Sequence, residues 1–135
     1  MAILVPYDGS MPAQEALEHA VREYPDTEIV LLRVIELAGG STGAGFELLR
    51  ERFESGEVEA DLSREVDNHL DADTDVRIET APGKPARTIV QYAEDHDVEH
   101  IVMGSHGREG VSRALLGSVA ENVIRRSPVP VTIVR

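Results

Sequence analysis

The sequence predicts an α/β protein: a single-domain three-layer sandwich in which a five-stranded parallel sheet carries helices on both faces. Short apolar runs without polar alternation recur along the chain, and such runs are typical of strands buried on both faces of a parallel sheet. Segments of helical periodicity separate these runs. This alternation predicts right-handed crossovers between parallel strands. The length of 135 residues fits one domain, which we expect to span residues 1–135.

The first 34 residues predict a strand, a helix and a second strand. Residues 2–5 are a short apolar run and predict the first strand. Ser10 fits the cap of a helix whose first turn tolerates Pro12, and Pro25 stops this helix. Residues 29–34 predict the second buried strand. The apolar residues that repeat at helical spacing between the strands are Ala13, Ala16, Leu17, Ala20, Val21 and Tyr24.

A glycine-rich loop and a long charged helical region are predicted next. Residues 36–45 follow the carboxyl end of a strand, where loops that close over ligands are common; a plain flexible connector fits equally well. In the helical region the apolar stripe changes sides by roughly half a turn near Ser55 and Gly56. We therefore expect a break or kink at these two residues.

Three strands and two helices are predicted after residue 75. Residues 76–80 alternate between apolar and polar side chains, which predicts an edge strand with one wetter face, and residues 81–85 predict a turn. Residues 101–103 predict a fourth, buried strand. The last strand, from Val129 to Val134, contains a proline, so we place it at a sheet edge. The two helices are predicted from the stripes Ala86, Ile89, Val90, Ala93 and Val119, Ala120, Val123, Ile124.

Composition narrows the class of partner. The formal net charge is −12, so the surface is too acidic to predict binding to nucleic acid or to an anionic membrane. Residues 104–126 nevertheless carry four arginines against two glutamates, a local excess that suits a small anionic ligand. No apolar run is long enough to span a bilayer, no signal-peptide pattern is present, and no cysteine occurs. These features predict a soluble, cytoplasmic protein.

The basic residues are almost all arginine, since Lys84 is the sole lysine. Together with 25 acidic residues, this bias suggests adaptation to high salt, where repulsion between like charges is screened. GC-rich codon usage with an ordinary acidic surface is the alternative explanation.

The segment of residues 104–124 predicts a phosphate-binding site. Gly104 and Gly107 follow a predicted strand, and Gly117 and Ser118 precede a predicted helix. Glycine lets backbone approach a ligand closely, and the first turn of a helix offers unpaired N–H groups and partial positive charge to an anion. The alternative is purely structural: the glycines make turns, and Ser118 with Glu121 forms a capping box that uses the hydroxyl internally. No P-loop sequence occurs.

The glycine register, G-2x-G-9x-G-S, resembles the nucleotide-binding signature of the universal stress protein family. Further similarity covers the whole chain: Val-Pro-Tyr-Asp-Gly-Ser at residues 5–10, Gly-Lys-Pro at 83–85, Met-Gly-Ser-His-Gly-Arg at 103–108, and Leu-Leu-Gly-Ser at 115–118. The resemblance implies a Rossmann-like, adenine nucleotide alpha hydrolase-like fold with strand order 3-2-1-4-5. It also implies ATP binding and a homodimer formed through the last strand, Val129 to Val134.

The resemblance implies a role for each matching residue. Asp8 lies near the ribose or the phosphates, where a carboxylate requires sugar hydroxyls or a bridging Mg²⁺ as its partner. The phosphates are expected at Gly104, Gly107, Gly117 and Ser118. Pro6 and Val34 are expected to flank the adenine and Met103 to line the pocket, with ordinary strand core an equal alternative for Val34 and Met103. For Arg108 a phosphate contact and a solvated loop position are equally open. The complete predicted set is Pro6, Asp8, Val34, Met103, Gly104, Gly107, Arg108, Gly117, Ser118 and Val119.

Three functions compete. The first is an ATP-binding regulatory protein with little chemistry, and the second is a slow ATPase or self-phosphorylating enzyme. The third is an interaction module whose glycines only make turns. Phosphoryl transfer needs metal ligands and a cationic clamp, and this sequence offers no evident base to activate water, so binding is favoured over catalysis. A receiver domain is excluded because Asp8 lacks a paired acid, and the histidines show no metal-ligand spacing.

Overall fold

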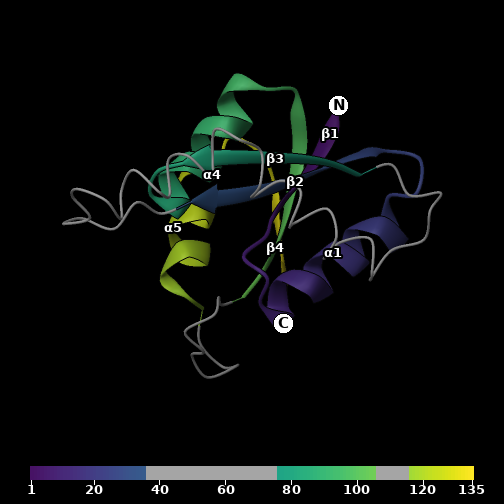
Figure 1. Cartoon of the computed structure of the whole chain (residues 1–135), viewed down its shortest axis with the longest axis horizontal. Helices are drawn as coiled ribbons and strands as arrows, with labels where there is room; N and C mark the ends of the chain where they lie inside the picture. Colours follow the sequence, from purple (N-terminus) through teal and green to yellow (C-terminus); the bar gives the residue numbers. More distant parts are fainter. Residues whose placement is uncertain (36–75, 106–115) are drawn as a thin grey trace, which may run out of the picture.

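The computed structural model describes residues 1–35, 76–105 and 116–135 and contains a five-stranded sheet (Figure 1). All strand pairs are parallel, and the order is β3-β2-β1-β4-β5. The predicted fold class and strand order are therefore confirmed. The strands are β1 (Ala2–Pro6), β2 (Glu28–Ile35), β3 (Val76–Pro82), β4 (Val98–Gly104) and β5 (Val131–Val134).

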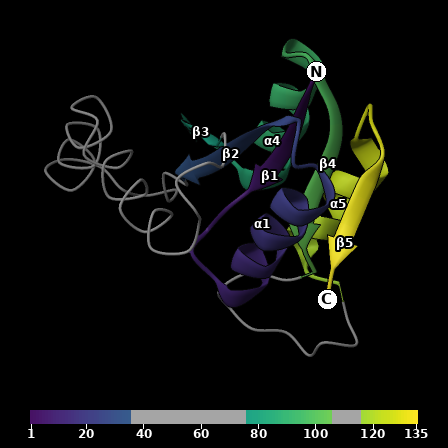
Figure 2. The same cartoon turned by 90° about the vertical axis from the view of Figure 1, so that its right-hand side faces the viewer.

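Helices cover both faces of the sheet, as expected. Helix α1 (Met11–Glu23) packs on one face, and α4 (Pro85–Asp95) and α5 (Ser118–Arg126) pack on the other (Figure 2). Side chains of β1 alternate between the two cores: Ile3 and Val5 contact the α1 side, and Leu4 contacts the α4/α5 side. All three of these side chains are fully buried. A strand buried on both faces must be apolar throughout, which explains the unbroken apolar run in β1.

The two edge strands were also predicted correctly, but several strand ends were not. Strand β4 begins at Val98, before the predicted start at residue 101. The partly buried polar residues Glu99 and His100 belong to the strand, and they interrupt the apolar pattern from which its start was predicted. Strand β5 begins at Val131, so the prediction from Val129 was two residues too long. Pro130 precedes the strand, and its carbonyl accepts the Ile101 N–H at 3.0 Å. Strand β3 continues through Pro82, where a turn was predicted. The predicted loop 36–45 and the helical region predicted after it, including the kink at Ser55–Gly56, lie outside the described residues.

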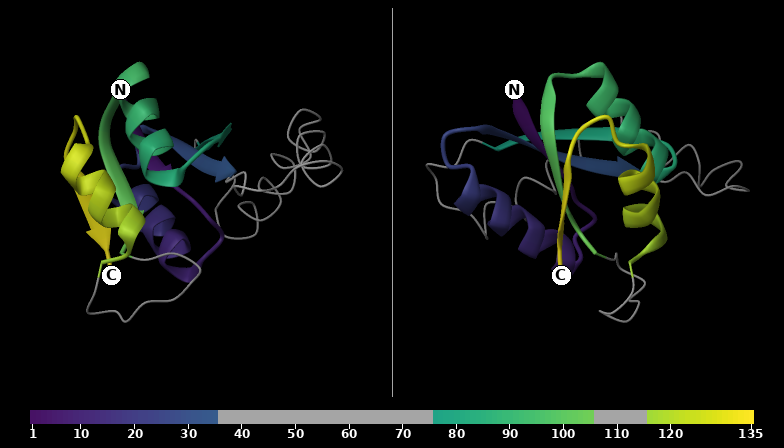
Figure 3. Two further views of the ribbon diagram at one scale, coloured as in Figure 1. Left: turned by 90° about the vertical axis from the view of Figure 1, so that its left-hand side faces the viewer. Right: turned by 180° about the vertical axis from the view of Figure 1, so that it is seen from behind.

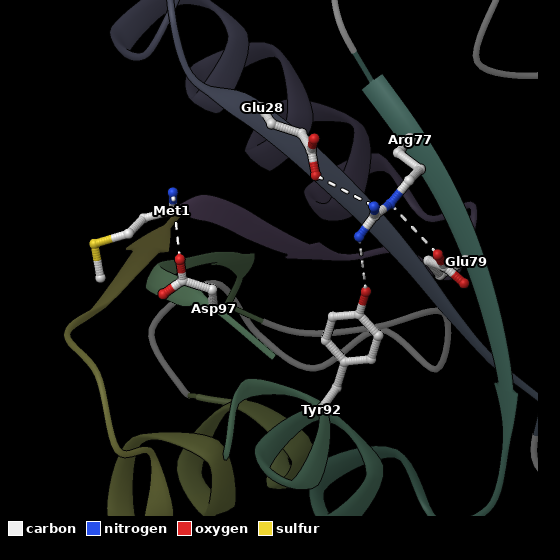
Figure 4. Close-up of polar contacts among 6 residues, drawn as sticks. All are labelled: Met1, Glu28, Arg77, Glu79, Tyr92 and Asp97. Atoms are coloured by element: carbon white, nitrogen blue, oxygen red, sulfur yellow. Dashed lines mark hydrogen bonds and ion pairs between the residues drawn. The ribbon is translucent and has the colours of Figure 1, made fainter. Parts of the chain in front are cut away.

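An ionic cluster holds edge strand β3 onto its neighbours (Figure 4). The Arg77 guanidinium lies 3.6 Å from the Glu28 carboxylate of β2 and 3.4 Å from Glu79 of β3. It also donates to the Tyr92 hydroxyl of α4 at 3.4 Å, and this hydrogen bond is the main cause that raises the pKa of Arg77. Because Arg77 is half exposed, each ion pair is worth little, roughly 0–1 kcal/mol. The charges also make this edge unfavourable for pairing with another strand.

Charge repulsion is expected to set the salt dependence of stability. With a net charge of −12, the folded chain repels itself, and salt screens this repulsion over about 10 Å at 0.1 M and about 3 Å at 1 M. We expect the urea midpoint to rise between 0.1 M and 2 M KCl. A variant with exposed Glu18 and Glu94 changed to lysine should be more stable at low salt and respond less to KCl. Equal salt responses in the two proteins would contradict repulsion as the cause.

No helix in the described part of the chain is both long and apolar enough to cross a bilayer.

Candidate functional site

The candidate site lies at the carboxyl ends of the neighbouring strands β1 and β4, where these two strands separate. The pairing of β1 with β4 ends at Leu4 and Ile101. Beyond these residues, β1 pairs with β2 up to Pro6, and β4 pairs with β5 up to Gly104. In open parallel sheets ligands bind outside the carboxyl ends of the strands where the order of connection reverses, and this is that position.

Segments far apart in the sequence meet at the carboxyl ends of these strands. In both views of Figure 3, the starts of α1 and α5 lie at the same end of the molecule as the carboxyl ends of β4 and β5. A Cβ placed on Gly104 would lie 2.6 Å from the Cβ of Pro12, so the end of β4 touches the first turn of α1. The start of the helix after β1 and the carboxyl end of β4 therefore come together.

Helix α1 begins with a side-chain cap. The Ser10 hydroxyl accepts the Ala13 N–H at 3.3 Å, as its predicted capping role requires. The Asp8 carboxylate accepts the Ser10 N–H at 2.9 Å, and Gly9 between them has φ 81°. This positive φ is the conformation that favours glycine. Asp8 is thus held in a tight turn and places negative charge beside the site.

The first turn of α5 is built differently. Its N-cap is Gly117, whose φ of −68° and ψ of 160° are ordinary extended values, and no side chain caps the helix. Ser118 is the first helical residue and is exposed, so the predicted capping box of Ser118 with Glu121 is wrong. Gly117 is the N-cap because its backbone is extended and its carbonyl accepts the Glu121 N–H at 3.0 Å. As the N-cap residue, Gly117 therefore offers the first-turn N–H groups of α5 no side-chain acceptor.

Ser105 links the end of the sheet to α5, which the sequence did not reveal. Its carbonyl accepts the Gly117 N–H at 2.7 Å, and its own N–H donates to the Val134 carbonyl at 3.1 Å. Ser105 is 1% exposed and is the one buried polar residue in the described part of the chain. A single hydrogen bond thus joins Ser105 and Gly117, the residues on either side of the segment 106–116. A serine beside a glycine carries no signal in the sequence that would distinguish this role from a turn.

Three apolar residues of the predicted site lie on the α4/α5 side of the sheet. Met103 is 5% exposed and belongs to the core cluster there, and Val34 and Val119 are half-buried and pack against that same cluster. Met103 is therefore a core residue, whereas Val34 and Val119 keep exposed surface. Pro6 pairs with Leu32 within the sheet and is half-buried.

Two predicted residues, Gly107 and Arg108, and the neighbouring His106 lie outside the described residues. Within the three described ranges, no group of three or more histidine, cysteine, aspartate or glutamate side chains is arranged to hold a metal ion. The described site therefore consists of an anion-attracting helix terminus, a carboxylate held in a turn, and half-buried apolar surface. Of these features, the helix terminus suits a phosphate, and the carboxylate suits a group that donates hydrogen bonds.

Comparison with known proteins agrees with this description. The sequence model of the universal stress protein family matches residues 1–135. A universal stress protein of Methanocaldococcus jannaschii is 36% identical, over 98% of this chain and 93% of its own length. The solved structure of the universal stress protein UspA from Lactobacillus plantarum is 29% identical, with a TM-score of 0.82 over 100% of this chain and 97% of that one. A universal stress protein from Archaeoglobus fulgidus, solved in complex with dAMP, is 24% identical, with a TM-score of 0.65 over 100% of this chain and 98% of that one.

Proposed function

The chain belongs to the universal stress protein family, and from that premise we propose that it is an ATP-binding regulatory protein with little or no catalysis. The observation that carries this proposal is the start of α5, where the N-cap residue Gly117 has no side chain to accept the first-turn N–H groups. Helix termini of this kind bind phosphate. Gly117 and Ser118, the last two residues of the glycine register, lie at this terminus.

An adenine nucleotide is the ligand class that the comparison favours. A protein of the same fold has been solved with dAMP, although its 24% identity supports only the architecture directly. Half-buried Val34 and Val119 offer apolar surface for a base. We assign the phosphates to Gly117 and Ser118 and the ribose side to Asp8. Gly107 and Arg108 complete the proposed phosphate contacts.

Binding is favoured over hydrolysis for a physical reason. Asp8 is one carboxylate, and its Oδ1 accepts the Ser10 N–H at 2.9 Å. Phosphoryl transfer requires bridging metal ions and a residue that orients the nucleophile. Asp8 could hold Mg²⁺ only together with the nucleotide's own phosphates, so we propose Mg-ATP rather than a metal held by the protein. A slow ATPase is the second candidate.

We further propose a homodimer formed through β5. The Pro130 carbonyl accepts the Ile101 N–H of β4, and the Val134 carbonyl accepts the N–H of Ser105, the residue after β4, so alternate residues of this strand face the sheet. Val131 and Ile133 therefore direct their N–H and C=O groups outward. An open edge of this kind pairs readily with another strand, and a two-fold axis brings the same edge of a second copy against it.

The first test is the nucleotide carried by the purified protein. Denaturing fresh protein and analysing the supernatant by mass spectrometry should release ATP at close to one molecule per chain. Release of ADP instead would favour the ATPase and justify a turnover assay. Protein that releases nothing and also fails to take up added Mg-ATP by calorimetry would overturn the proposal in favour of an interaction module. A denatured protein of similar size without the glycine register serves as the control for carry-over.

A further inference from the structure

Gly104 is required by a contact rather than by its backbone conformation. In the described residues only Gly9 and Gly83 have positive φ, so the φ of Gly104 suits any amino acid. An added Cβ, however, would lie 2.6 Å from the Pro12 Cβ, 2.8 Å from its carbonyl carbon and 2.9 Å from its carbonyl oxygen. Two of these three atoms are backbone and cannot rotate away. A side chain at position 104 must therefore displace the first turn of α1.

The turn that would move includes Asp8. The Ser10 N–H donates to the Asp8 carboxylate at 2.9 Å, and the Ser10 hydroxyl accepts the Ala13 N–H at 3.3 Å. The Gln14 side-chain amide donates to the Gly9 carbonyl at 3.3 Å. These bonds join residues 8–14 into one unit. A displacement of Pro12 is therefore passed on to the Asp8 carboxylate.

The residue after Gly104 is attached to the other half of the site. The Ser105 carbonyl accepts the Gly117 N–H at 2.7 Å, so Gly104 at the end of β4 and Ser105 directly after it contact the starts of both helices. We propose that Gly104 is a positioning residue: its contact with Pro12 sets the distance between Asp8 and the first turn of α5. This inference rests on the proposed function, because it matters for a ligand that reaches both groups.

A Gly104→Ala variant separates positioning from general damage. ATP contacts both Asp8 and α5, whereas inorganic tripolyphosphate contacts only the phosphate end. We expect the variant to bind ATP roughly tenfold more weakly or worse, because misplacement by about 1 Å is enough for such a loss. Its affinity for tripolyphosphate should fall less than its affinity for ATP, because tripolyphosphate does not reach Asp8. Both affinities are measured by calorimetry or by competition against a fluorescent nucleotide.

Two controls complete the experiment. Val98→Ala removes buried side-chain atoms from the opposite end of β4 and should lower stability without changing either affinity. Pro12→Gly loosens the same contact without adding an atom. It should weaken the binding of ATP but not of tripolyphosphate, and it replaces Gly104→Ala in the experiment if that variant does not fold.

The outcomes distinguish the inference from the function on which it rests. Wild-type ATP affinity in Gly104→Ala, or equal losses for both ligands, would overturn the positioning role. Failure of the wild-type protein to bind either ligand would overturn the proposed function instead. In that case, amide NMR signals of the nucleotide-free protein still test the geometry. Signals of residues 8–14 must shift in Gly104→Ala, and unchanged signals would refute the inference.

Discussion

A Gly117→Asp variant is expected to lose ATP binding while unfolding at a higher temperature than the wild-type protein. Gly117 is the N-cap of α5, and its φ of −68° and ψ of 160° suit aspartate. The new carboxylate would accept first-turn N–H groups and interact favourably with the helix dipole, which together stabilise by about 1 kcal/mol. For a chain of this length, that corresponds to a rise in melting temperature of roughly 3–5 °C.

The same carboxylate would occupy the phosphate position. It would remove charge-assisted hydrogen bonds and add repulsion, together about 3 kcal/mol or a loss of roughly 100-fold in affinity. A rise in stability together with a loss of affinity is the result expected where a helix terminus is left uncapped and binds a ligand. Thermal melts followed by circular dichroism and ATP titration by calorimetry measure the two effects.

Matched variants at the same position give the controls. Gly117→Val should also abolish binding, because its branched side chain fills the phosphate space, but it cannot cap α5 and should not raise the melting temperature. Ser118→Ala removes an exposed hydroxyl and leaves the backbone N–H groups, so a loss of only a few-fold is expected. Tight ATP binding by Gly117→Asp or by Gly117→Val would refute the assignment of the phosphates to α5.

Most of the fold could be predicted from the sequence because burial on both faces of a parallel strand leaves an unmistakable pattern. Residues 2–5 show it fully, and the structure places them in β1 at the centre of the sheet. The prediction failed where polar residues enter a strand. Glu99 and His100 belong to β4 although neither is apolar, and the His100 ring contacts the Thr132 hydroxyl of β5 at 2.6 Å. Such a contact across strands is invisible to a periodicity analysis.

The candidate site was predictable in position but not in detail. Strand ends and glycine spacing located it, since Asp8 and Gly104 each follow or end a central strand. The sequence offered Ser118 as a helix cap, whereas the structure shows that Gly117 holds that position. A one-residue difference of this kind decides whether the hydroxyl is used internally or is exposed. The contact of Gly104 with Pro12 depends on how α1 docks against β4, and no local sequence pattern encodes that packing.

The dimer proposal leads to the second large effect: an Ile133→Pro variant is expected to be monomeric. Val134 directs its carbonyl to Ser105, the residue after β4, so the neighbouring Ile133 directs its N–H outward, toward the proposed second copy. Proline lacks this N–H and is tolerated in edge strands, so it removes an intermolecular hydrogen bond while the β4–β5 pairing remains. Sedimentation equilibrium at micromolar concentration should give twice the chain mass for wild type and the single chain mass for the variant.

The matched control is Ile133→Ala, which truncates the same side chain but keeps the outward N–H. Ile133 is half-buried against the α4/α5 core, so both variants lose packing within the chain and should be destabilised to a similar extent. Only the proline variant also lacks the hydrogen-bond donor. A dimeric Ile133→Ala protein beside a monomeric Ile133→Pro protein would therefore assign the interface to backbone pairing along β5. A wild-type protein that remains monomeric across micromolar concentrations and high salt would refute the dimer itself, and the outward groups of β5 would then be hydrated by solvent.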